Sequence, residues 1–110
     1  METKPRTIFY YVTPAGRSPF LEWLENLNDH RGRGFIRSRI KRLELGNPGM
    51  FRSLGEGLSE LKIDFGPGYR IYFGQDGETL VILLCGGDKS TQSRDMGKAR
   101  EFWKDYWRRK

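Results

Sequence analysis

The sequence is poor in the residues that most often carry chemistry in small proteins. Its 110 residues include one histidine, His30, and one cysteine, Cys85. Catalysis by a pair of histidines is therefore excluded, and so is a zinc site built from the usual four Cys and His ligands. Because Cys85 lies in an apolar run and has no partner for an intramolecular disulfide, we expect a buried thiol. We expect neither a metal nor another cofactor.

Long hydrophobic segments are also missing. The longest apolar run, LVILLC at residues 80–85, is far shorter than the roughly 20 residues that span a bilayer. The N-terminal sequence METKPRTIFYYV carries charged and polar residues where an export signal needs an apolar stretch. No P-loop, dinucleotide-binding glycine motif or G-x-S-x-G motif occurs. These absences favour a cytoplasmic protein with no membrane partner.

Positive charge is the clearest compositional signal. Lys and Arg number 20 against 14 for Asp and Glu, which gives a net charge of +6. Hydrophobic residues make up 36% and charged residues 31%, a balance typical of one folded domain spanning residues 1–110. The excess charge favours a polyanion or an acidic protein as partner, although a basic surface without a partner would have the same composition.

The hydrophobic pattern predicts an α+β protein. Helical spacing predicts two N-terminal helices, one beginning at Ser18-Pro19 and one at about residues 35–45, with an interruption at 26–34. A C-terminal helix is predicted at about residues 92–107. Alternation and turn residues predict strands at residues 6–12, 58–64, 69–73 and 79–85. We therefore expect three helices packed on a small antiparallel sheet of about four strands.

The second predicted helix carries a basic face. Arg33, Arg37 and Lys41 follow one another at the i, i+4 spacing that places side chains on one side of a helix. Such a face suits a phosphate backbone, because clustered Arg and Lys supply the salt-dependent part of nucleic-acid affinity. A solvated helix surface without a ligand is the alternative.

Three short segments carry a family resemblance: LSELKI at 58–63, GPGYRIYF at 66–73 and GGDKSTQ at 86–92. Together with the order of the elements, they resemble the RelE/HigB superfamily of bacterial toxin–antitoxin toxins, above all its branch of phage-derived or addiction-module killer proteins. The resemblance implies a RelE-like fold and a growth-arresting toxin, neutralised by a cognate helix-turn-helix antitoxin in a hetero-oligomer. It also implies a ribosome-dependent endoribonuclease (an mRNA interferase), because most characterised RelE and HigB toxins cut mRNA on the ribosome.

Other activities occur on the same fold. The related ParE toxins inhibit DNA gyrase and cleave no nucleic acid, so the fold by itself leaves the activity open. An RNA-binding domain without toxicity is a further alternative.

Arg70 is the first candidate for a catalytic role. RNA cleavage of this kind uses the 2′-hydroxyl as nucleophile on the adjacent phosphorus, without a metal. The protein aligns these groups, stabilises the added negative charge and moves two protons. Arg70 matches the arginine of the family's GYR strand, and its planar fork can hold two phosphate oxygens. We predict that Arg70 contacts the scissile phosphate; the alternative is a strand arginine paired with Glu60 or Asp64.

Two more candidates precede Arg70 in the sequence. Lys62 can converge with Arg70 if the Gly-Pro-Gly turn pairs the two strands. A lysine among other cations can accept a proton near neutral pH, because their repulsion lowers its pKa. Asp64 stands where RelE itself has a second basic residue, which makes Asp64 an alternative base.

The remaining candidates lie near the start of the last predicted helix. Lys89 follows two glycines, and the helix N-terminus that comes next favours anions, so Lys89 is predicted to bind phosphate or take part in catalysis. A simple capping loop is the alternative. Gln92 and Arg94 are predicted RNA contacts. RelE-like enzymes often stack a base on a tyrosine in this region; the corresponding position here is Met96, so Tyr69 is the local aromatic alternative.

Overall fold

The computed structural model describes residues 4–110 and confirms an α+β architecture of three helices on one sheet. The sheet has five strands instead of about four. In chain order the elements are β1 (Thr7–Tyr10), α1 (Pro19–Glu25), α2 (His30–Glu44), β2 (Phe51–Gly55), β3 (Leu58–Ile63), β4 (Tyr69–Asp76), β5 (Leu80–Gly87), the single 3-10 turn η1 (Lys89–Thr91) and α3 (Gln92–Arg109).

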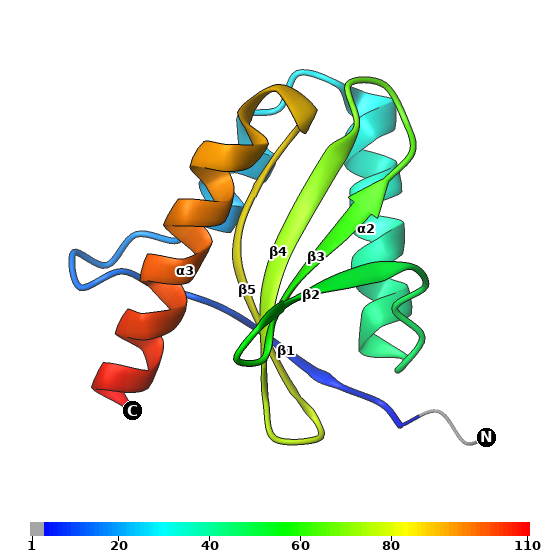
Figure 1. Ribbon diagram of the computed structural model, residues 1–110. Helices are drawn as coiled ribbons and strands as arrows, with labels where there is room; N and C mark the ends of the chain where they lie inside the picture. The colour runs from blue at the N-terminus through cyan, green and yellow to red at the C-terminus, as the bar shows by residue number, and fades with distance from the viewer. Residues whose placement is uncertain (1–3) are drawn as a thin grey trace.

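The sheet is mixed, which corrects the predicted antiparallel arrangement. Its strand order is β1-β5-β4-β3-β2, and β2 to β5 form an antiparallel series (Figure 1). β1 pairs with β5 in parallel, from Thr7 opposite Leu80 to Tyr10 opposite Leu83. Parallel strands are joined by a long crossover connection. The sequence therefore contains no short turn between β1 and β5 that would indicate their relative direction.

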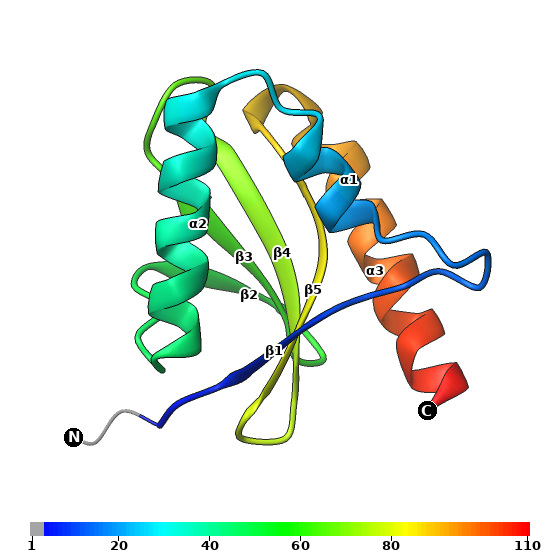
Figure 2. The same ribbon diagram turned by 180° about the vertical axis from the view of Figure 1, so that it is seen from behind.

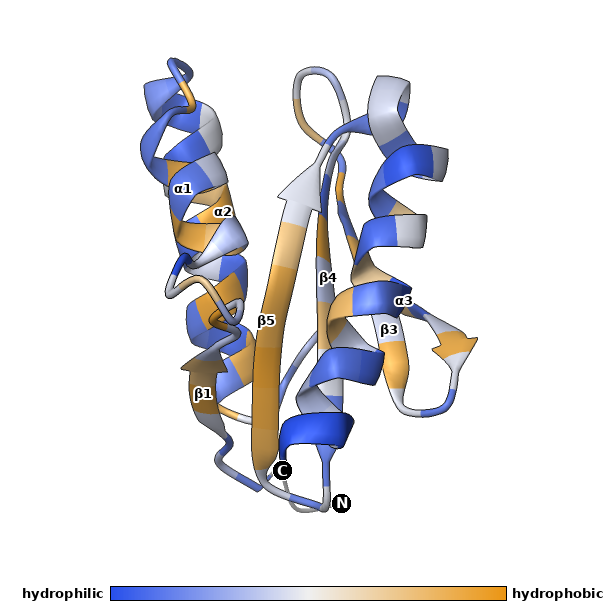
Figure 3. Cartoon of the chain, turned by 90° about the vertical axis from the view of Figure 1, so that its left-hand side faces the viewer, coloured by the Kyte–Doolittle hydropathy of each residue, from blue (hydrophilic) through white to orange (hydrophobic). Residues whose placement is uncertain are grey.

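The helices cover both faces of the sheet. α3 lies on one face and α1 and α2 on the other, as the front and back views show (Figures 1 and 2). β5 is apolar along most of its length because it is covered on both faces (Figure 3). Within this strand Cys85 is buried, as predicted, and burial raises the pKa of its thiol to about 12.

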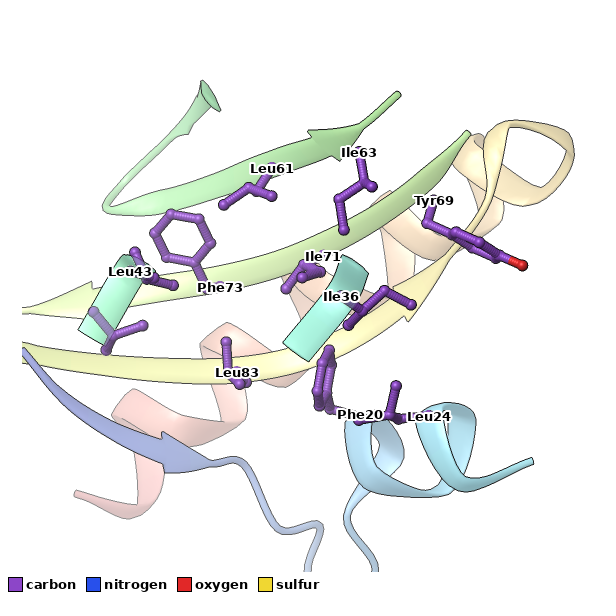
Figure 4. Close-up of a cluster of buried hydrophobic side chains, with 11 residues drawn as sticks. Phe20, Leu24, Ile36, Leu43, Leu61, Ile63, Tyr69, Ile71, Phe73 and Leu83 are labelled. Carbon is purple, nitrogen blue, oxygen red and sulfur yellow. The ribbon is translucent and has the colours of Figure 1, made fainter. Parts of the chain in front are cut away.

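The strands alternate between two cores. In β4, Tyr69, Ile71 and Phe73 face α1 and α2, where they join a cluster with Phe20 and Ile36 (Figure 4). The intervening side chain of Tyr72 belongs to the core under α3. Because successive side chains of a strand point to opposite faces, Arg70 lies on the α3 side. The central strand is therefore buried on both faces.

The N-terminus of α2 lies earlier than predicted. The helix begins at His30, and Asp29 caps it by accepting a hydrogen bond from the Gly32 amide at 2.9 Å. The glycines and polar residues that predicted an interruption thus form the first turn. Gly32 is required there, because a Cβ would come within 2.6 Å of Asp29 and of Tyr69. The bond from Gly32, followed by one from the Tyr69 hydroxyl, lowers the pKa of Asp29.

The unpredicted strand β2 forms a tight hairpin with β3. Glu56 and Gly57, which connect them, both have positive φ (56° and 83°), as a type I′ hairpin requires. The Trp103 indole donates a 2.8 Å hydrogen bond to the carbonyl of Glu56, so α3 holds this turn. β2 is mostly exposed and lacks apolar alternation, which explains why its sequence did not indicate a strand.

Within residues 4–110, no helix combines the length and the apolar character that a bilayer crossing requires.

Two glycine substitutions test the packing of α3 on the sheet. A Cβ on Gly74 would come within 2.3 Å of the Trp103 ring, whereas a Cβ on Gly97 would meet no atom within 4 Å. We expect Gly74→Ala to lower the free energy of unfolding by about 1–3 kcal/mol through overpacking. Gly97→Ala, in the exposed part of α3, should raise it by about 0.5–1 kcal/mol. Urea denaturation measures both, and equal effects of the two substitutions would contradict this packing.

Candidate functional site

A cleft of about 320 Å³ opens on the α3 side of the sheet, near the end of β4 where Arg70 lies. It is bounded by β2, β3, β4 and the first residue of α3. Its lining residues are Met50, Phe51, Arg52, Glu60, Lys62, Arg70 and Gln92. A second and more apolar groove, about 400 Å³, runs along β1 and contains none of the predicted site residues. Of the predicted site residues, Lys62, Arg70 and Gln92 line the cleft by β4.

Lys62 and Arg70 lie directly opposite each other on β3 and β4. Directly paired residues of antiparallel strands share a face, so both side chains belong to the cleft. Lys62 is exposed and forms an ion pair with Asp64 at 3.5 Å. Arg70 is only 7% exposed. Its Nη1 donates a 2.6 Å hydrogen bond to the carbonyl of Gly68, while its Nε has no hydrogen-bond partner.

Glu60 is a buried carboxylate at the floor of the cleft. Its Oε2 accepts hydrogen bonds from the Tyr72 hydroxyl at 2.8 Å and from Gln92 Nε2 at 2.9 Å. Its Oε1 lies 3.0 Å from Nη2 of Arg52. Arg70 Nε is 3.9 Å from Oε2, which is an ion-pair distance but too long for a hydrogen bond. Four partners from β2, β4 and α3 therefore surround one carboxylate of β3.

Tyr72 is a fixed donor in this network. Burial, and next the hydrogen bond to Glu60, raise the pKa of Tyr72 far above its ordinary value. The hydroxyl therefore stays protonated at physiological pH and donates to the carboxylate.

Lys89 lies beside the cleft. Its amide is 3.4 Å from the carbonyl of Pro67, and the neighbouring Gly68 lies between the Lys89 Cβ and the Arg70 guanidinium. η1 begins here with a capping box formed by Asp88 and Thr91, so the capping alternative for this loop is present. Lys89 itself is exposed and does not line the cleft.

The structure does not bring every predicted site residue to the cleft. Asp64 is 90% exposed at its side chain and lies just beyond β3. Tyr69 faces the opposite core, where its hydroxyl donates to Asp29 at 2.7 Å. Burial and this bond raise the pKa of Tyr69 to about 12. Arg94 is exposed, pairs with Asp95 at 3.5 Å and lines a different groove.

The helix α2, which carries the predicted basic face, lies on the other side of the sheet from α3 (Figure 2). Arg37 is exposed there, Arg33 contacts His30 at 2.8 Å, and Lys41 pairs with Glu44 at 3.0 Å. Arg39 alone reaches toward the cleft residues, since its Nη1 donates to the carbonyl of Lys62 at 3.2 Å. The α2 cations thus form a surface separate from the cleft.

Sequence reasoning missed Arg52 as a site residue, and it treated Glu60 only as a possible partner of Arg70. Both depend on β2, because Arg52 lies directly opposite Glu60 in the β2–β3 pair. The available signal was the Gly-Glu-Gly segment at 55–57, which marks a hairpin between FRSL and LSEL. Among residues 4–110, no three His, Cys, Asp or Glu side chains gather where they could hold a metal ion.

The fold and the cleft define a small α+β protein with a cleft lined by three cations and one carboxylate at one end of its sheet. The family model for phage-derived Gp49-like proteins (DUF891) matches residues 22–103, which include every residue that lines the cleft. The chain belongs to this family, which is associated with toxin–antitoxin systems. An uncharacterized protein of Haemophilus influenzae is 49% identical over 81 residues, which cover 74% of this chain and 82% of that protein.

The Tyr72 hydroxyl is the most deeply buried donor to Glu60, and its removal tests the network. We expect Tyr72→Phe to lower the free energy of unfolding by about 1–3 kcal/mol, because a buried carboxylate loses a donor that water does not replace. Tyr10→Phe is the matched control, since Tyr10 is 40% exposed, and we expect a change within about 0.5 kcal/mol. Urea denaturation of the wild-type protein and of the two variants measures these changes. Equal stabilities of the three proteins would contradict the hydrogen-bond network around Glu60.

Proposed function

We propose that this protein is the toxin of a bacterial toxin–antitoxin module and cleaves mRNA on the ribosome as a metal-independent endoribonuclease. One observation carries the proposal: Arg52, Lys62 and Arg70, from three adjacent strands, line a single cleft. Cations clustered in this way suit a polyanion. The association of the family with toxin–antitoxin systems supports the toxin role.

The residues of the cleft suit attack by the 2′-hydroxyl on the neighbouring phosphorus. Arg70 would stabilise the extra negative charge of the phosphorane, because a guanidinium offers donors in a fixed plane. Its anchor on the Gly68 carbonyl holds that plane before substrate arrives. Lys62 and Lys89 are the proposed groups for proton movement and for contact with the phosphate. Asp64 pairs with Lys62 at the exposed edge and is the alternative base.

A cognate helix-turn-helix antitoxin is the proposed protein partner. Its hetero-oligomer with this chain would shield the cleft, and the net charge of +6 favours an acidic covering segment. The same positive charge would favour RelE-like binding to the ribosome, because ribosomal RNA is a polyanion.

Substitution of Arg70 tests the proposed chemistry. We expect Arg70→Ala to slow cleavage of mRNA on purified, programmed ribosomes by about 10²–10³-fold, because charge stabilisation in the transition state is lost. Arg108→Ala removes the same side chain from the exposed end of α3 and should leave the rate unchanged. Circular dichroism establishes that each variant is folded, since Arg70 is buried.

Two results would contradict this function. Growth arrest by the wild-type protein with intact mRNA would exclude cleavage as its cause. Toxicity retained by Arg70→Ala together with blocked gyrase supercoiling would instead support a ParE-like inhibitor.

The cations of α2 are proposed to contact ribosomal RNA, because they lie away from the cleft. We expect Arg37→Ala/Lys41→Ala to weaken ribosome binding and to reduce the slope of log affinity against log salt by about 2, one for each lost phosphate contact. The maximal cleavage rate of bound complexes should not change. Lys98→Ala/Lys104→Ala, on exposed positions of α3, removes the same charge from the other face. Equal losses in both double variants would show a general charge effect and refute a specific α2 contact.

A further inference from the structure

Glu60 is the only acidic side chain among the residues that line the cleft. A carboxylate at this position repels the phosphates that the surrounding cations attract. It is also only 6% exposed, and burial of a charge is costly unless it is paired and hydrogen-bonded. A carboxylate in the proposed phosphate site therefore needs a function that outweighs its repulsion of phosphate and the free-energy cost of its burial.

The partners of Glu60 indicate that role. Arg52 is 58% exposed along its side chain, yet its guanidinium reaches Glu60 Oε1 at 3.0 Å. Arg70 is buried and leans toward Oε2 at 3.9 Å, held from its other side by the Gly68 carbonyl. Tyr72 and Gln92 fix the carboxylate itself through two hydrogen bonds to Oε2. One hydrogen-bonded carboxylate thus stands between an exposed arginine and a buried one.

We propose that Glu60 is a positioning residue that holds Arg52 and Arg70 in the orientation in which they receive the phosphate of the RNA substrate. Its link to catalysis rests on the endoribonuclease function proposed above. A long side chain loses rotamer freedom when it binds a ligand. A side chain that an ion pair has already ordered loses less conformational entropy. Phosphate oxygens of the RNA would compete with Glu60 Oε1 for Arg52. The Arg52 guanidinium would then exchange the carboxylate for a phosphate close to the same position.

A base role for Glu60 does not fit its contacts. Oε2 already accepts two hydrogen bonds, and Oε1 carries the Arg52 ion pair. Both carboxylate oxygens are therefore already engaged by neighbouring donors. One of these partners would have to leave before a 2′-hydroxyl proton could be transferred.

Glu60→Gln separates positioning from simple repulsion, because the two effects have opposite signs. Removal of a negative charge from an anion site should leave binding of a short single-stranded RNA, with 2′-deoxy substitution to prevent cleavage, unchanged or tighter. If Glu60 positions the arginines, the cleavage rate of bound mRNA should nevertheless fall by about 10–100-fold. Glu25→Gln, which neutralises an exposed carboxylate at the end of α1, away from the cleft, should leave the rate unchanged.

A spectroscopic measurement reports the positioning without any activity. In ¹H–¹⁵N spectra of the arginine Nε–H groups, we expect a resolved signal of Arg52 in the wild-type protein that moves to the position of freely exposed arginines in Glu60→Gln. The same signal should persist in Glu25→Gln. Arg37, which is exposed on α2, supplies the reference for a free side chain.

Arg52→Ala keeps the proposal testable if Glu60→Gln does not fold, because Arg52 is exposed. It should lower the cleavage rate by a similar factor. Where Glu60→Gln does fold, adding it to Arg52→Ala should lower the rate little further, since the two residues act as one unit. An unchanged rate in Arg52→Ala would overturn the proposal, and so would an unchanged Arg52 signal in Glu60→Gln. Loss of the acid limb of the pH–rate profile in Glu60→Gln would also overturn the positioning role, because it would show that Glu60 acts as the general base. If the wild-type protein cleaves no mRNA, the proposed function fails, and the arginine signals alone decide the positioning role.

Discussion

The buried carboxylate of Glu60 joins more elements than any other polar group near the cleft. It lies on β3 and is contacted by Arg52 of β2, by Tyr72 and Arg70 of β4, and by Gln92 of α3. An ionised carboxylate in this position is stable only while these donors surround it. The cleft therefore exists only where the hairpin, the central strand and the last helix have docked together, and its chemistry is coupled to the integrity of the sheet.

Much of the fold could be predicted because its signals are local. Alternation and glycine turns located β3, β4 and β5, and a Ser-Pro start located α1. The rest depends on long-range contacts. β2 is exposed on most of its length and is held by a tight turn and by Trp103, neither of which leaves apolar alternation in the sequence. In the first turn of α2, Gly32 is required by the close approach of Tyr69, so packing overrides its low helix propensity.

The candidate site was predictable to the extent that it follows strand alternation. Lys62 and Arg70 share a face because their strands are joined by a short turn. The same alternation places Tyr69, the immediate neighbour of Arg70, on the opposite face, so the two side chains could not both line one cleft. Arg52 could not be placed without β2. The central position of Glu60 was hidden for a different reason. Its four partners come from three separate segments of the chain, and only the tertiary structure shows that they meet at one carboxylate.

The parallel pairing of β1 has a consequence for the order in which the protein folds. Among the strands of residues 4–110, β1 is synthesised before the others, yet its one neighbour in this part of the sheet is β5, whose pairing begins with Thr7 opposite Leu80. Contacts between such distant segments form slowly, because the intervening chain must be ordered first. During synthesis β1, with the apolar side chains of Phe9 and Tyr10, therefore stays unpaired until most of the polypeptide has been made. The nascent chain carries an unpaired strand edge for that whole interval, which is the condition under which strands pair with the wrong neighbour.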